Sequence, residues 1–135
     1  MIYEKRITIP KNTPAYAPAL TTIPIHPGVL QQVQVYFPPG CCALAHVVIK
    51  YWERQLFPTN PDSDFTGDDT LIEFSEDLEI VDPPYEFVVL GWNEDDTYSH
   101  TIIVRMQIIP HDRSLRNILT RLAIGTTGPI MYAGE

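Results

Sequence analysis

The chain has 135 residues, of which 44% are hydrophobic, so it can form the core of one globular domain without a disulfide. Its 13 prolines against 7 glycines argue against long helices through most of the sequence. The net charge is -8. The absence of a leader pattern and the lack of a long apolar run predict a soluble, unexported protein that binds no membrane.

Acidic residues are concentrated in the middle of the chain. Fourteen of the 17 lie between Glu53 and Asp96, whereas both ends are mildly basic. An acidic body repels phosphate, so we expect no nucleic-acid binding by the core. Solubility alone is the other explanation for a charge of this size.

The first 27 residues are predicted to form a proline-rich extended arm. Residues 3–9, YEKRITI, alternate apolar and polar side chains, which is typical of a short exposed strand. Proline then recurs at positions 10, 14, 18, 24 and 27, which forbids a helix and interrupts strand pairing. A single edge strand at 19–25 is the alternative for the second part of the arm.

Residues 28–110 are predicted to form a β body. Apolar side chains alternate along 29–37, 42–52 and 100–109, and TLIEF at 70–74 and YEFVVLGW at 85–92 lie between them. The short polar loop before residue 100 predicts a hairpin that pairs residues 85–92 with residues 100–109. Together these patterns indicate an all-β fold, an antiparallel two-sheet β-sandwich or jelly roll.

Residues 111–135 show a different pattern, which predicts one short amphipathic helix that stops near Gly125 and an extended tail. The apolar residues at helical spacing are Leu115, Ile118, Leu119 and Leu122. Because these side chains are apolar, either the sandwich or another chain must cover them.

The stretch DSDFTGDDTLIE at 62–73 places oxygen-bearing side chains and a glycine at the positions of a helix-loop-helix calcium loop. Pro58 and Pro61 precede it and a strand pattern follows, so the flanking helices are not expected. A calcium loop on a β scaffold stays open beside an ordinary solvated acidic loop. Its candidate ligands are Asp62, Asp64, Asp68 and Glu73.

No catalytic motif is present in the sequence. The histidines are scattered, Cys41 and Cys42 are adjacent, and neither a nucleophile elbow nor a phosphate loop occurs. We therefore expect no enzyme and no cofactor other than calcium. Trp92 and Tyr98 flank a polar loop and are candidates for a sugar-stacking platform, with core packing as the alternative.

Three stretches, IHPGVLQQVQVYFPPG, LFPTNP and DPPYEFVVLGWNEDDTYSHTIIVR, resemble the small β-sandwich auxiliary proteins, called decoration or cement proteins, of tailed-phage-like virions. The resemblance covers about residues 26–109 and concerns architecture, so no functional residue is carried over. It implies a non-enzymatic bacteriophage virion component, assembled in the host cytoplasm. Such a protein forms an oligomer, commonly a trimer, and bridges subunits of the major capsid protein.

Apolar residues left over at the two ends of the chain are candidates for contacts between subunits or with a shell. They are Tyr16, Leu20, Ile23, Ile25, Leu115, Ile118, Leu119, Leu122, Ile130 and Met131. Two other functions stay open at the level of sequence. One is a carbohydrate- or receptor-binding β-sandwich module, and the other is a calcium-dependent extracellular adhesive or filament subunit.

Overall fold

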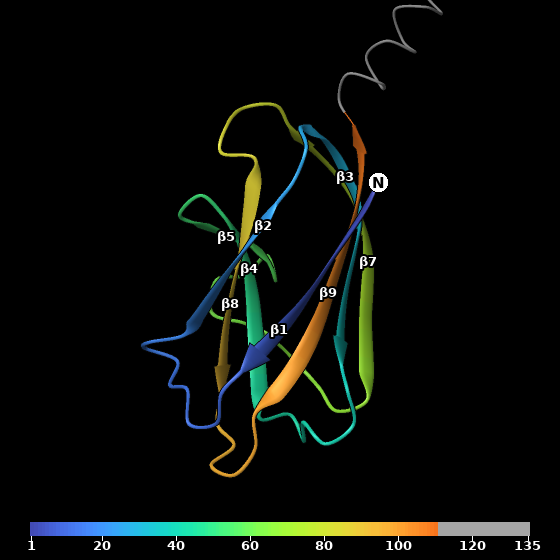
Figure 1. The fold of residues 1–135 in the computed structure, drawn as a ribbon. Coiled ribbons are helices and arrows are strands. Elements are labelled where there is room, and N and C mark those ends of the chain that lie inside the picture. Colours follow the sequence, from blue (N-terminus) through green and yellow to red (C-terminus); the bar gives the residue numbers. More distant parts are fainter. Residues whose placement is uncertain (111–135) are drawn as a thin grey trace, which may run out of the picture.

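The computed structural model describes residues 1–110, which form two antiparallel β-sheets packed face to face (Figure 1). This confirms the prediction of an all-β fold and is consistent with a β-sandwich. The described range contains no helix, and hence none long and apolar enough to cross a membrane. The predicted helix at 115–122 and the tail after it lie outside the described residues.

Sheet A has the strand order β1-β9-β3-β7, and sheet B has the order β2-β8-β4-β5. The strands of sheet A are β1 (Ile2–Ile9), β9 (His100–Pro110), β3 (Gly28–Phe37) and β7 (Thr70–Ile80). Those of sheet B are β2 (Ala19–Pro24), β8 (Glu86–Asn93), β4 (Ala45–Tyr51) and β5 (Arg54–Phe57), and the short β6 (Phe65–Thr66) pairs with β4.

Most strands pair with partners that are distant in the sequence. Antiparallel pairs join β1 to β9, β2 to β8, β3 to β7 and β4 to β5, so the chain follows the path of one long hairpin with its tip at the β4–β5 turn. Two further antiparallel pairs, β3 with β9 and β4 with β8, roll this hairpin into the two sheets. Both chain ends of the described structure therefore lie in sheet A (Figure 1).

The core lies between the sheets and is built from one face of each strand. On β3, Val33, Val35 and Phe37 are fully buried, because alternate residues of a strand point to the same face. On β9 the predicted inward set from Ile102 to Ile108 is confirmed, since its alternate side chains are at most 1% exposed. These apolar contacts supply the main driving force for closing the two sheets.

The prediction of a separate N-terminal arm is wrong for the described chain, whereas the predicted strand at 3–9 and the alternative of an edge strand at 19–25 are confirmed. Residues 1–27 contribute an edge strand to each sheet, β1 to sheet A and β2 to sheet B. The prolines at 10, 14 and 18 fall in the connection between these strands, and Pro24 is the last residue of β2. At those positions the missing N–H of proline removes no hydrogen bond between central strands, so the prolines are compatible with two edge strands.

The predicted hairpin between the last two strands is also wrong. β8 belongs to sheet B and β9 to sheet A, so the loop at 94–99 crosses from one sheet to the other. Asn93 fixes the start of this crossing, because its side-chain amide donates to the carbonyl oxygens of Ile9 and Tyr98 at 3.2 and 3.0 Å. The same side chain accepts the N–H of Asp95 at 3.0 Å.

Candidate binding surfaces

The structure does not bring the four predicted calcium ligands of the acidic stretch at 62–73 together. Asp64 contacts His46, and Asp68 accepts the N–H groups of Gly40 and Cys42 at 2.8 and 3.2 Å. The other two predicted ligands, Asp62 and Glu73, accept from the side-chain amides of Asn60 and Gln32. Residues 1–110 contain no group of three or more carboxylate, histidine or cysteine side chains placed to hold a metal ion. The carboxylates are separated because the stretch bends through β6 and into β7, which sends alternate residues in different directions.

His46 on β4 lies between two carboxylates and an aromatic ring. Its Nδ1 is 2.7 Å from Asp64 Oδ1, and its Nε2 is 3.0 Å from Glu94 Oε2 without the alignment of a hydrogen bond. The imidazole stacks on Trp92 with a ring separation of 5.4 Å and an interplanar angle of 9°. One face of this indole is therefore already occupied, which weakens Trp92 as a platform for sugar.

The loop after β8 is organised by Asp95. Its Oδ1 accepts the N–H groups of Thr97 and Tyr98 at 2.8 and 3.2 Å, and its Oδ2 lies 2.8 Å from His100 Nε2. The bond from the Thr97 amide, followed by that from His100, holds the pKa of the Asp95 carboxyl below its ordinary value. The Tyr98 side chain is 67% exposed, so the predicted ligand role of its ring stays a prediction.

The predicted contact residues of the N-terminal region fall into two groups. Tyr16 and Leu20 are 92% and 65% exposed and are available for contacts with another molecule. Ile23 and Ile25 are 4% and 8% exposed and belong to the core of their own chain, which corrects their assignment as contact residues. Alternation along β2 explains the split, since Leu20 and Ile23 point to opposite faces of sheet B. The remaining candidates, Leu115, Ile118, Leu119, Leu122, Ile130 and Met131, lie outside the described residues.

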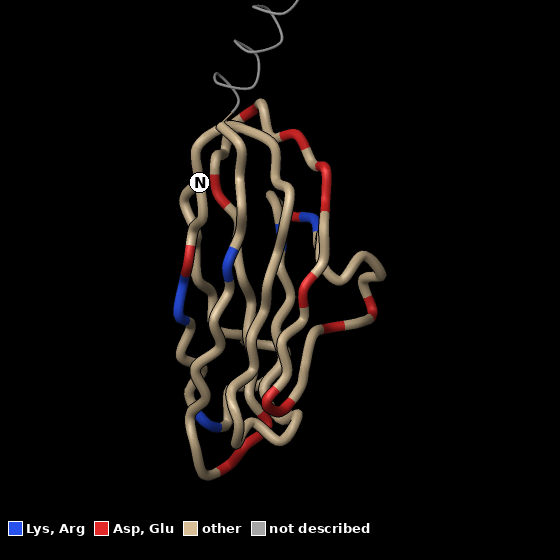
Figure 2. Tube along the Cα trace, turned by 90° about the vertical axis from the view of Figure 1, so that its right-hand side faces the viewer, with Lys and Arg blue, Asp and Glu red and all other residues tan. Residues whose placement is uncertain are grey.

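Sheet A has edge strands of opposite charge. Edge strand β1 carries Lys5 and Arg6 against Glu4, which is ion-paired with Arg6, whereas β7 carries four acidic residues between Glu73 and Glu79. Figure 2 shows basic residues next to acidic ones on the side of the molecule where the N terminus lies, and mainly acidic residues along the opposite side. The charge difference therefore runs across the whole width of the sheet.

A row of polar side chains connects these two edges on the outer face of sheet A. Arg105 Nε lies 3.5 Å from Glu4 Oε2 on β1, and Arg105 Nη1 donates to Gln34 Oε1 at 3.4 Å on β3. Gln34 Nε2 in turn donates to Glu73 Oε2 on β7 at 2.6 Å. The row ends in a carboxylate at the acidic edge, where a basic side chain could extend it.

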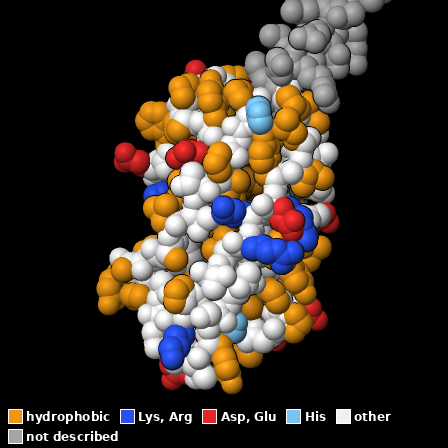
Figure 3. Space-filling model, viewed as in Figure 1, with side chains coloured by type: hydrophobic (Ala, Val, Ile, Leu, Met, Phe, Trp, Pro, Cys, Tyr) orange, Lys and Arg blue, Asp and Glu red, His pale blue; other side chains and the backbone are white. Residues whose placement is uncertain are grey.

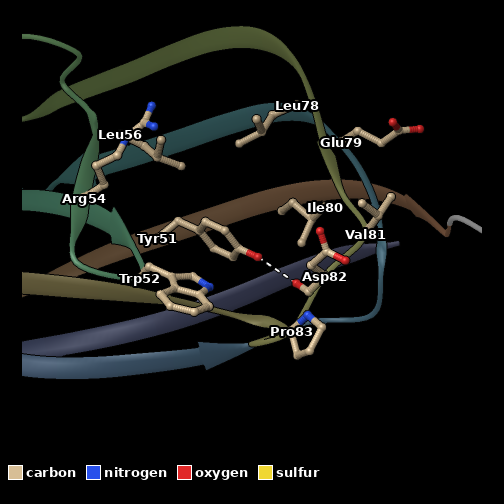
Figure 4. Close-up of a pocket in the computed structure, with 10 residues that line it drawn as sticks. All are labelled: Tyr51, Trp52, Arg54, Leu56, Leu78, Glu79, Ile80, Val81, Asp82 and Pro83. Atoms are coloured by element: carbon tan, nitrogen blue, oxygen red, sulfur yellow. Dashed lines mark hydrogen bonds between the residues drawn. The ribbon is translucent and has the colours of Figure 1, made fainter.

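A groove opens between the edge strands β5 and β7, on the side away from β1 and β2. It has two adjoining parts of about 460 and 540 Å³, which share Arg54, Leu56 and Leu78. We define the β5–β7 groove by an apolar floor and two large apolar side chains at its mouth. The floor is Tyr51, Leu56, Leu78 and Ile80, and the mouth is Trp52 and Val81 (Figure 4).

The floor of the groove is continuous with the protein core. Tyr51, Leu56 and Leu78 pack against the core cluster, and Ile80 is 2% exposed. The Tyr51 hydroxyl donates to the Asp82 carbonyl oxygen at 2.8 Å, which fixes one end of the groove (Figure 4). An occupant would therefore find a rigid apolar surface.

Trp52 and Val81 at the mouth of the groove are 61% and 45% exposed. Trp52 lies in the two-residue turn between β4 and β5 with a φ of 61°, a left-handed conformation that is uncommon for a bulky residue. Hydrophobic side chains also gather at the upper end of the face seen in Figure 3. Large exposed apolar side chains beside a groove are typical of an interaction site.

Carboxylates surround the groove. Glu53, Glu76, Glu79 and Asp82 line its two parts, against the single guanidinium of Arg54. This excess of negative charge favours an occupant with basic side chains next to its apolar ones. The sequence did not identify the groove, because Trp52 and Val81 stand in unrelated segments; an aromatic residue inside a two-residue turn was the one local signal.

No family model, no curated protein and no solved structure matches this chain. The function must therefore be inferred from the geometry of its surfaces. Two surfaces stand out among residues 1–110: the oppositely charged edges of sheet A and the β5–β7 groove.

Proposed function

We propose that the chain is a non-enzymatic structural protein that assembles with copies of itself through the edge strands of sheet A. The observation that supports this proposal is the opposite charge of β1 and β7. Within residues 1–110, no further strand lies on the outer side of either one. An exposed edge strand is a template for pairing with another chain.

The direction of the two strands suits such pairing. Each strand of sheet A is antiparallel to its neighbour, so β1 and β7 run in opposite directions. A second copy in the same orientation would therefore bring its β1 antiparallel to β7 of the first, with Lys5 and Arg6 near the acidic edge. Like charges would oppose pairing of β7 with β7, so the contact is head to tail. A head-to-tail contact closes into a ring if the rotation between copies permits, and a trimer is the expected ring.

We further infer that the two sheets form a jelly roll. The nested pairs β1–β9, β2–β8, β3–β7 and β4–β5 support this assignment. Jelly rolls occur in viral capsid and lectin domains, among others, and the fold alone does not assign a function. It is nevertheless compatible with the resemblance of the sequence to capsid auxiliary proteins.

The specific form of the proposal is a capsid auxiliary, or decoration, protein that bridges subunits of a major capsid protein in a virion. Purified particles should contain the chain at a fixed copy ratio to the shell protein, as measured by quantitative mass spectrometry. Particles from a producing host that lack the chain would refute this form. Self-assembly through sheet A would then still be testable on the purified protein.

Light scattering on the purified protein tests the assembly contact. We expect a closed oligomer for the parent and a lower mass for Arg6→Glu and for Asp77→Lys, because each reversal places like charges at the contact. The double variant, Arg6→Glu with Asp77→Lys, should recover the larger mass, since every contact of the ring again joins opposite charges. Lys11→Glu is the control, because this residue lies outside β1. A parent that remains monomeric, or variants with the parental mass, would contradict the proposal.

A further inference from the structure

We propose that the β5–β7 groove is a docking site for the C-terminal segment of the same chain, residues 111–135. The groove shares β7, with Glu76 and Glu79, with the acidic edge of sheet A, but the inference does not depend on the proposed assembly. Three observations support it: the place where the described chain ends, the apolar lining of the groove and the charge around it.

The described chain ends close to the groove. Gly28 on β3 pairs with Pro110 of β9 on one side and with Ile80 of β7 on the other. Adjacent strands are spaced by roughly 4.8 Å, so the two partners of Gly28 lie roughly 10 Å apart. Ile80 is part of the groove floor, and a span of this length takes about three extended residues. Leu115, the first apolar residue of the predicted helix, comes five positions after Pro110 and can reach the groove.

The two partners match in chemistry. The groove offers an apolar floor and a mouth of Trp52 and Val81, which are costly to leave in water. The segment offers Leu115, Ile118, Leu119 and Leu122 at the spacing of one helical face. Docking would remove both apolar surfaces from water.

The charges also match. The segment contains three arginines, at 113, 116 and 121, against Asp112 and Glu135, whereas the groove has four carboxylates and one arginine. The local connection raises the effective concentration of the segment at the groove to the millimolar range, which favours docking within one chain over exchange between chains.

Fluorescence of Trp52 in the full-length protein tests the inference. The chain has two tryptophans, so Trp92→Phe leaves Trp52 at the mouth of the groove as the only indole. In this background we expect Leu119→Asp to shift the emission maximum to longer wavelength and to increase quenching by acrylamide. Thr120→Asp is the matched control, because it adds the same charge one position away, off the apolar face.

Three outcomes are distinguishable when the measurement is made at low concentration with the mass recorded. A change with Leu119→Asp and none with Thr120→Asp, at constant mass, supports docking within the chain. Identical emission and quenching in all variants would overturn it. A change that appears only together with a change of mass would assign the groove to the segment of a second copy and overturn docking in the same chain.

Discussion

Replacing Asn93 with alanine tests whether one buried side chain holds the end of the sandwich together. Asn93 is 1% exposed and makes three side-chain hydrogen bonds, two to carbonyl oxygens of Ile9 and Tyr98 and one from the Asp95 N–H. Each such bond contributes a net ~1 kcal/mol, so we expect a loss of about 3 kcal/mol in the free energy of unfolding. For a domain of this size the loss corresponds to a fall of roughly 10 °C in the melting temperature.

Urea unfolding followed by circular dichroism measures this loss. Asn60→Ala is the control, because its amide makes only exposed hydrogen bonds, with Asp62 and Ser63. The control should stay within about 0.5 kcal/mol of the parent. A loss below about 1 kcal/mol for Asn93→Ala would refute the reasoning. The crossing between the sheets would then depend on its backbone contacts alone.

Three further predictions concern single sites. The pKa of Asp95 is lowered in the folded state, so its contribution to stability is present above about pH 4 and is lost as the pH falls through the folded-state pKa. The difference in free energy of unfolding between the parent and Asp95→Asn, measured in urea, should therefore shrink as the pH is lowered. A difference that stays constant with pH would contradict this prediction. Cys42 is exposed, whereas Cys41 is buried and burial raises the pKa of its thiol. A thiol reagent at pH 7 should therefore modify Cys42 alone in the folded protein and both cysteines in urea. The folded Cys42→Ser variant should not react. Gly28→Ala would place a Cβ 2.1 Å from the Ile109 carbonyl oxygen, a backbone atom that cannot rotate away, so we expect a loss of about 3 kcal/mol or more, and near-parental stability would show that β3 and β9 can separate there.

Local patterns in the sequence identified most of the strands. Alternation predicted the inward faces of residues 33–37 and 100–109, because the side-chain period of a strand is two and one face must be buried. Val29 was also predicted to face inward, but Leu30 is buried in its place, because the register shifts between Leu30 and Gln32. The strand predicted at 70–74 continues to Ile80 in the structure. The sequence did not predict this extension, because the alternation becomes irregular where β3 and β7 change register near Leu30 and Gln32. A bulge of this kind leaves no clear signal in a single sequence.

The candidate sites were harder to predict than the strands. The calcium stretch has suitable residue types at suitable spacing, yet coordination depends on where the backbone directs each oxygen. Asp64 instead reaches His46, eighteen residues earlier, and Asp68 binds backbone N–H groups near Gly40. The groove depends on the relative position of β5 and β7, and the charged edges depend on that of β1 and β7. These positions are set by the tertiary structure.

The sequence by itself determined the all-β class, the inward faces of the main strands and the excess of acid in the middle of the chain. These properties follow from composition and from the period of two, which act over a few residues. The tertiary structure alone decided that β8 and β9 lie in different sheets and that residues 1–27 close one side of both. Pairing across almost the whole chain, as between Ile2 and Gln107, depends on which arrangement buries the most apolar surface, and no local pattern records that competition.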